Sequence, residues 1–135
     1  YGVLYDIANR VYTGRPIHLR AGHVNVIWQG DVNAQVIRAL HHCEVPSRPL
    51  NMGGPEQASV RNLATEFGRR FGLEPQFVNQ ESGIGWHNDT SLAAKIFGYP
   101  EVPLMRMIDW TVDWIERDQP HYNLPTHFEE RDGSF

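Results

Sequence analysis

Apolar residues recur along this chain at the spacing that places them on one face of a helix. The clearest run predicts a helix over residues 2–13, which ends before Gly14 and Pro16. Its apolar positions are Val3, Leu4, Ile7, Ala8 and Val11. The same spacing predicts four further helices, which begin after Asp31, after Ser59, after Asp89 or Thr90, and at Pro103.

Several of these helices have residues suited to their ends. The side-chain oxygens of Asp31, Ser59 and Asp89 or Thr90 can accept hydrogen bonds from the first backbone N–H groups, as an N-cap does. Gly72 and Gly98 are placed to end the third and fourth helices. On the second helix we expect the apolar face to be buried, namely Val32, Val36, Ile37 and Leu40. On the last helix the expected buried stripe is Leu104, Met107, Ile108, Thr111, Val112 and Ile115.

Short apolar stretches between the helices predict strands. Residues 24–28 alternate apolar and polar side chains, as a half-buried strand does. Briefer stretches predict strands at residues 17–19, 49–52 and 76–78, with Gly53-Gly54-Pro55 as a turn after the second of these three. Alternating strands and helices favour the α/β class, although strands this few and short cannot form an independent doubly wound sheet.

Composition limits the partners of the chain. It has 135 residues, enough for one small domain, and a net charge of −4 with acids and bases intermixed, so nucleic acid and anionic membranes are not expected. No apolar run approaches the roughly 18 residues that a membrane span needs. The lone cysteine, Cys43, fits a reducing, cytoplasmic compartment. The chain starts at Tyr1 inside a helical pattern, which predicts a fragment, an isolated domain or a processed chain.

Four motifs occur here in the order of one known family. They are Asn25-Val26-Ile27-Trp28-Gln29-Gly30-Asp31, Leu50-Asn51-Met52-Gly53-Gly54-Pro55-Glu56, the acid-led helix from Asp89 to Gly98-Tyr99-Pro100, and the last helix with Trp110 and Trp114. With them the chain resembles the extended short-chain dehydrogenase/reductase family, the NAD-dependent epimerases and dehydratases. The resemblance implies that residues 1–118 are the C-terminal substrate-binding domain, an α/β lobe with few short strands and about five helices. Residues 119–135 would be an extended tail.

The resemblance also implies where the chemistry takes place. In this family an N-terminal Rossmann lobe binds NAD or NADP through a glycine fingerprint and carries a catalytic tyrosine with a lysine four residues later. The single lysine of this chain, Lys95, follows Ser91 at that spacing, and no glycine fingerprint occurs. We therefore expect neither catalytic nor cofactor-binding residues here. The expected partners are the chain's own Rossmann lobe and a small-molecule substrate, and homo-oligomers would form mainly through Rossmann helices.

The complete enzyme would be an NAD(P)-dependent epimerase, dehydratase or dehydrogenase. The alternative is a non-catalytic binding or interaction module derived from the same lobe. Sequence preceding this chain distinguishes the two, because only the enzyme requires a glycine fingerprint upstream.

Six residues are candidates for binding the substrate. They are His23, Asn25, Trp28 and Gln29, on or beside the strand that lines the cleft by the resemblance, and Trp86 and His87 in the loop of residues 79–88. An amide beside an aromatic ring suits recognition of hydroxyl groups, since a buried amide without a partner penalises the wrong substrate. Asn25 and Gln29 are equally able to bond neighbouring backbone, and the two loop residues to be ordinary surface.

Two positions argue against a nucleoside-diphosphate sugar as substrate. Family enzymes that act on such sugars usually have an arginine at the start of the second strand, where its guanidinium pairs with phosphate oxygens. Val24 stands at that position, and the later loop has Glu81 and no arginine. The sequence therefore predicts a sugar, polyol or hydroxy acid without a diphosphate, with Arg20 as the nearest cation that could overturn this.

Three other features have plainer interpretations. Asp31 fits a helix N-cap better than a catalytic acid. His41-His42-Cys43 lacks the spacing of metal ligands. The polar tail is expected to lie outside the core, with Phe128 and Phe135 as small anchors on another part of the enzyme or on a partner subunit.

Overall fold

The computed structural model describes residues 1–81, 85, 88–124 and 126–129, and within them it is an α/β structure with helices dominant. The elements are α1 (Val3–Tyr12), β1 (Ile17–His18), β2 (His23–Val24), α2 (Gln29–Ala39), the 3-10 turn η1 (Leu40–His42), β3 (Ala58–Ser59), α3 (Val60–Phe71), β4 (Phe77–Val78), α4 (Ser91–Phe97) and α5 (Leu104–Glu116). None of these helices is long and apolar enough to cross a membrane.

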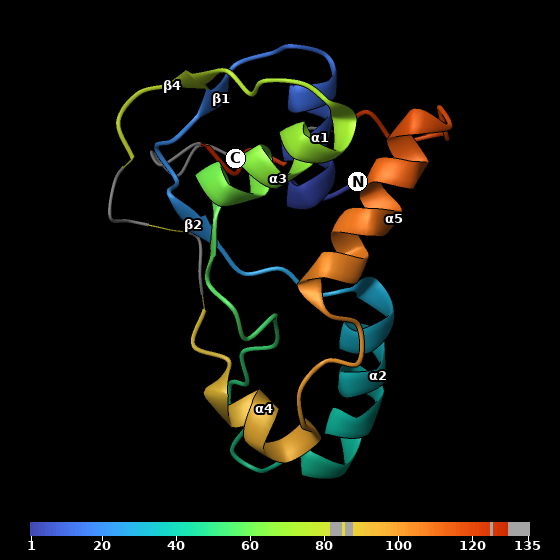
Figure 1. Ribbon diagram of the computed structural model, residues 1–135. Coiled ribbons are helices and arrows are strands. Elements are labelled where there is room, and N and C mark those ends of the chain that lie inside the picture. The colour runs from blue at the N-terminus through green and yellow to red at the C-terminus, as the bar shows by residue number, and fades with distance from the viewer. Residues whose placement is uncertain (82–84, 86–87, 125, 130–135) are drawn as a thin grey trace.

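The core lies where α1, α3 and α5 pack together, in the upper half of Figure 1. Each of these helices buries an apolar stripe, and the largest fully buried side chains include Phe67, Ile7 and Ile108. The last helix therefore follows its predicted stripe. Two small sheets flank this core: β1 pairs with β4 in parallel, and β2 pairs with β3 in antiparallel register.

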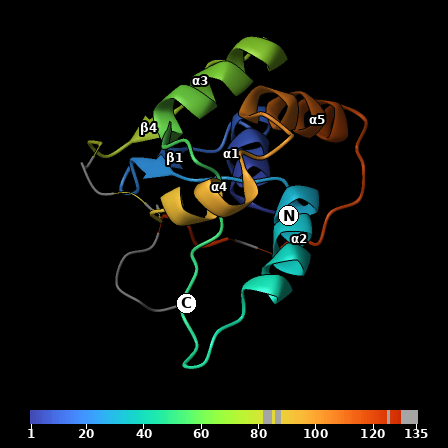
Figure 2. The same ribbon diagram turned by 90° about the horizontal axis from the view of Figure 1, so that it is seen from below.

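α2 and α4 form a second tier below the core, as Figures 1 and 2 show from two directions. Polar and ring contacts join them: the guanidinium of Arg38 donates to the carbonyl of Phe97 at 3.1 Å, and the ring of His42 meets the Phe97 ring edge-on. The backbone N–H of Val102, after α4, donates to the carboxylate of Asp31 at 3.0 Å. The contacts named here between the α2 side and the α4 side of this tier are thus mainly polar.

The sequence prediction for α2 is wrong in two respects. The helix begins at Gln29 with Trp28 at the N-cap, so Asp31 lies in the first turn, and its carboxylate bonds Val102 instead of capping the helix. Of the apolar face expected to be buried, Val32 is half-buried, but Val36, Ile37 and Leu40 are exposed, with accessibilities of 52%, 67% and 71%. The residues that α2 buries are Asp31 and Gln35, because its polar side faces α4 and residues 99–101.

Two predicted strands are also corrected. The strand expected at residues 24–28 is reduced to His23–Val24, because its partner β3 is only two residues long and offers no further backbone to pair with. Residues 49–52 form no strand, since no other strand lies beside them in the described part of the chain. β1 and β4 are confirmed, each shorter by one residue than expected.

The predicted ends of α3 are confirmed. The Ser59 hydroxyl accepts the backbone N–H of Asn62 at 3.3 Å, and Gly72 takes the left-handed conformation with φ of 68°. α4 begins after Thr90 and ends before Gly98, but Thr90 makes no capping bond; the carboxylate of Asp89 accepts the backbone N–H of Ser91 at 2.9 Å instead.

The tail differs from its prediction, because Phe128 is only 4% accessible and belongs to the same core as α1 and α5. The other expected anchor, Phe135, lies outside the described residues. The core of this chain is thus completed by its own tail.

Candidate functional site

The candidate residues divide between two places, and the first is where β2 meets the loop of residues 79–88. The amide of Asn25 is engaged at both ends: its nitrogen donates to the carbonyl of Gly54 at 3.0 Å, and its oxygen accepts the backbone N–H of Asn88 at 2.7 Å. One amide hydrogen and one lone pair remain for any other partner. Asn25 therefore joins three segments, which is the backbone-bonding alternative considered from the sequence.

Two described residues of this loop, Gly85 and Glu81, contact β2 and the β3–α3 segment. Gly85 lies so close to His23 that an added Cβ would stand 2.6 Å from its carbonyl oxygen. Glu81 accepts bonds from the hydroxyl of Ser59 and the guanidinium of Arg61, both at 3.3 Å. We call His23, Asn25, Gly85 and Asn88 the strand–loop site. Trp86 and His87, the two loop candidates, lie outside the described residues.

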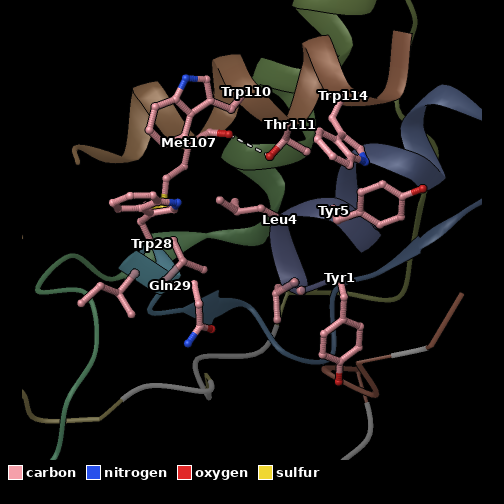
Figure 3. Close-up of a pocket in the computed structure, with 13 residues that line it drawn as sticks. Tyr1, Leu4, Tyr5, Trp28, Gln29, Met107, Trp110, Thr111 and Trp114 are labelled. Atoms are coloured by element: carbon pink, nitrogen blue, oxygen red, sulfur yellow. Dashed lines mark hydrogen bonds between the residues drawn. The ribbon is translucent and has the colours of Figure 1, made fainter. Parts of the chain in front are cut away.

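Trp28 and Gln29 lie elsewhere, in an open groove between the start of α1, residues 26–29 and α5 (Figure 3). The groove has a volume of about 480 Å³. Its aromatic lining residues are Tyr1, Tyr5, Trp28, Trp110 and Trp114, and we call it the aromatic groove. The rings of Trp28 and Trp110 meet edge-on with centroids 5.7 Å apart.

The aromatic groove is an apolar surface that stays open to solvent. Its three tryptophans are each between 43% and 45% accessible. No charged side chain is among the described residues that line it. Tyr5 keeps its proton there, because burial, and then the negative charge of Asp6, raises the pKa of its hydroxyl. Such a surface favours neutral, flat or apolar contacts.

From the sequence, Trp110 and Trp114 were part of a motif but not candidates for a site, and neither Tyr1 nor Tyr5 was a candidate. The available signal was the separation of four residues between the two tryptophans, which places both on one side of α5. Gln29 donates to the side-chain oxygen of Asn33 at 2.8 Å, a local bond that involves no backbone group. The structure thus places His23 and Asn25 at the strand–loop site and Trp28 and Gln29 at the aromatic groove. These are two separate places.

Arg61 and Glu81, the charged side chains beside β3 and the strand–loop site, are paired with each other. Val24 is 1% accessible within the core, so it presents no side chain to this surface. Arg61 lies over the ring of Phe77 at 4.6 Å while it bonds Glu81. Among the described residues no group of three or more His, Cys, Asp and Glu side chains is arranged to hold a metal ion.

The arrangement of elements is similar to that of solved epimerases. UDP-glucose 4-epimerase from Thermus thermophilus, solved as a complex with NAD, matches with a TM-score of 0.62 and 20% identity, over 84% of this chain and 39% of that one. UDP-glucose 4-epimerase from Thermotoga maritima, solved with UDP-glucose, matches with a TM-score of 0.63 and 19% identity, over 87% and 40%. This chain shares the fold of one part of those enzymes.

The chain spans about two fifths of the length of these epimerase structures. No protein-family model matches it, and no curated protein matches it. The likeness confirms the α/β fold class with few short strands predicted from the sequence, and at this level of identity it concerns the fold alone.

Proposed function

We propose that this chain is the C-terminal substrate-binding part of an NAD(P)-dependent enzyme of the epimerase/dehydratase type. In this proposal residues 1–118 are the substrate-binding domain and the later residues are its tail. The observation that carries the proposal is the orientation of α2, which buries Asp31 and Gln35 and exposes Val36, Ile37 and Leu40.

A surface helix normally has its apolar face toward the protein. α2 has the reverse arrangement, and fully burying one such aliphatic side chain is worth about 1.5–3 kcal/mol. A second body that covered Ile37 and Leu40 would recover part of that free energy. The part of the epimerases that this chain does not span is a body of suitable size and kind.

The aromatic groove supports the same partner. α2 begins one residue after Trp28, so the groove and the exposed face of α2 are neighbours along the chain. Tyr1 lines the groove, so a segment joined to its amino end would begin at this groove. We propose that an N-terminal lobe covers both surfaces and supplies the cofactor site with the tyrosine–lysine pair.

NAD or NADP bound in that lobe would accept a hydride from a substrate carbinol. The residues of this chain would orient the substrate: His23 and Asn25 from the strand–loop site, Trp28 and Gln29 from the edge of the aromatic groove. Trp86 and His87 remain candidates from the loop. The neutral lining of the groove beside Trp28 and Gln29 suits the hydroxyl groups and ring faces of a sugar or polyol.

We further propose that the substrate is a sugar, polyol or hydroxy acid without a nucleoside diphosphate. Phosphate oxygens buried without a cationic donor lose several kcal/mol of binding free energy. Val24 offers an isopropyl group inside the core, and the nearby Arg61 is already bonded to Glu81.

The test is to express the chain with the residues that precede it in its gene and to titrate both forms with NAD and NADP. We expect micromolar binding, near −8 kcal/mol, for the longer protein only. Micromolar binding by the 135-residue chain alone would contradict the proposal. An upstream sequence without a dinucleotide fold would favour the non-catalytic module.

The substrate class is tested separately, by competition of UDP, dTDP and GDP against turnover in the longer protein. We expect weak inhibition by all three. Tight inhibition that is lost in Arg20→Ala would show that Arg20 binds the diphosphate and that the substrate proposal is wrong, while leaving the enzyme class intact.

A further inference from the structure

Residues 126–129 return to the body of the molecule after an exposed stretch, and we call them the strap. Tyr122 and Leu124 before them are exposed, whereas Phe128 is buried in the core. The backbone N–H of Thr126 donates to the carboxylate of Asp6 on α1 at 2.9 Å, and its hydroxyl bonds the same carboxylate oxygen. The strap is therefore fixed to α1 through the carboxylate of Asp6.

Glu129 connects the strap to both β1 and α1. One carboxylate oxygen accepts the backbone N–H of His18 at 2.9 Å, and the other lies 3.0 Å from the guanidinium of Arg10. The side chain of Glu129 is mostly buried, at 15% accessibility. A largely buried carboxylate bonded to a strand N–H and a guanidinium is a strong, charge-assisted arrangement.

β1 is held along both of its edges as a result. Successive N–H groups of a strand point to opposite edges. Ile17 and Leu19 donate toward β4, to the carbonyls of Gln76 and Val78 at 2.8 and 3.1 Å. His18, between them, donates to Glu129 on the other edge. The strap therefore occupies the edge that β4 leaves open.

The side chain of His18 extends this connection to the loop. Its Nδ1 lies 3.1 Å from the amide nitrogen of Asn79, the residue directly after β4. The two side chains are therefore within hydrogen-bond distance of each other. Asn79 has φ of 67°, in the left-handed region where a residue other than glycine needs local support.

We propose that Glu129 is a positioning residue for Asn79, the residue at which the chain leaves β4. The strap fixes β1, and His18 then fixes Asn79 beside it. The connection runs Arg10–Glu129–His18–Asn79 and involves no residue of the aromatic groove. It holds whatever molecule the strand–loop site binds.

The experiment compares Glu129→Ala, Glu129→Gln and the control Glu116→Ala, which removes an exposed carboxylate from the end of α5. Amide hydrogen exchange and the side-chain amide signals of Asn79 are measured by NMR. In Glu129→Ala we expect protection of the Ile17 and Leu19 amides to fall about ten-fold or more while α3 keeps its protection. The Asn79 signals should shift, because its bond to His18 loosens.

Glu129→Gln retains an oxygen for the His18 N–H, so it is expected to restore most of the protection and the Asn79 signals. If Glu129→Ala does not fold, Glu129→Asp, whose carboxylate is one methylene shorter, takes its place with the same expected order. Unchanged Asn79 signals, an equal loss of protection throughout the chain, or the same change in Glu116→Ala would each show that Glu129 only adds stability.

Discussion

A Cβ atom placed on Gly54 would stand 1.8 Å from the carbonyl oxygen of Val26. The obstacle is backbone, which cannot rotate away as a side chain can. We therefore expect Gly54→Ala to separate residues 26 and 54 and to lower the free energy of unfolding by about 3 kcal/mol or more. Urea denaturation followed by circular dichroism measures this loss.

Gly53→Ala is the matched control. The nearest atom to its added Cβ would be Cγ2 of Thr90 at 3.3 Å, a methyl group that can shift slightly. We expect a loss of about 1 kcal/mol or less. Equal losses in the two variants would mean that the approach of Gly54 to Val26 is looser than the structure indicates.

Asn25→Ala tests whether this amide supports the strand–loop site. The change removes the donor to Gly54 and the acceptor for Asn88, so we expect a loss of about 1–3 kcal/mol in unfolding free energy. Asn25→Asp keeps the acceptor but sets a carboxylate against the Gly54 carbonyl, and should be no more stable than Asn25→Ala. Gln29→Ala, which removes only a local exposed bond, should stay within about 0.5 kcal/mol of the parent. An unchanged denaturation midpoint in Asn25→Ala would assign Asn25 to ligand binding alone.

The contribution of Glu66 to the free energy of unfolding should change with pH in the acid range. Hydrogen bonds from Arg69, and then from Arg70, lower the pKa of this carboxyl from 4.5 to about 2. Because the pKa is depressed in the folded state, the carboxylate stabilises the fold above about pH 4.5, and this contribution is lost as the pH falls toward 2. Glu66→Gln should therefore be less stable than the parent at pH 7, by about 1 kcal/mol, and equally stable near pH 2. A pH-independent difference would contradict this origin, and added salt should reduce the difference at pH 7.

The exposed face of α2 predicts self-association of the isolated chain. Ile37 and Leu40 are more than half exposed, so Ile37→Glu with Leu40→Glu should change the unfolding free energy by only about 0.5 kcal/mol. The double variant should sediment as a monomer, whereas the parent chain should associate as its concentration rises. Tyr122→Glu, at an exposed aromatic residue of the tail, should associate as the parent does. A parent chain that stays monomeric at all concentrations would count against α2 as a docking face.

Local signals predicted local structure well. The bounds of α3 follow from Ser59 and Gly72, because capping depends on a few neighbouring backbone groups. The burial of α2 could not be predicted in the same way. Its apolar stripe indicates that another protein surface covers the helix. The sequence pattern does not indicate whether that surface belongs to this chain or to another part of the protein. Residues 49–52 show the same limit, since a strand requires a partner that a linear pattern does not identify.

The site was predicted less completely, for a similar reason. Asn25 and Trp28 are three residues apart in one motif, yet they serve different surfaces, because the chain leaves strand geometry after Val24. The aromatic groove combines residues from α1, residues 26–29 and α5, and only the packing of α1 against α5 brings them together. The prediction that the tail lies outside the core is wrong for Phe128. Its neighbours in the sequence are polar, so the pattern did not indicate that its ring is buried.

The bond between Asp6 and Thr126 has a consequence for biosynthesis, because its partners are 120 residues apart. A ribosome adding about 5–20 residues per second delivers them about 6–24 s apart. During that interval α1 is present without Phe128, which completes the core. The edge of β1 that bonds Glu129 is also without its partner. A nascent chain in this state exposes apolar surface and an open strand edge, the features that molecular chaperones bind. The core around α1 is therefore completed only after residues 126–129 have been translated.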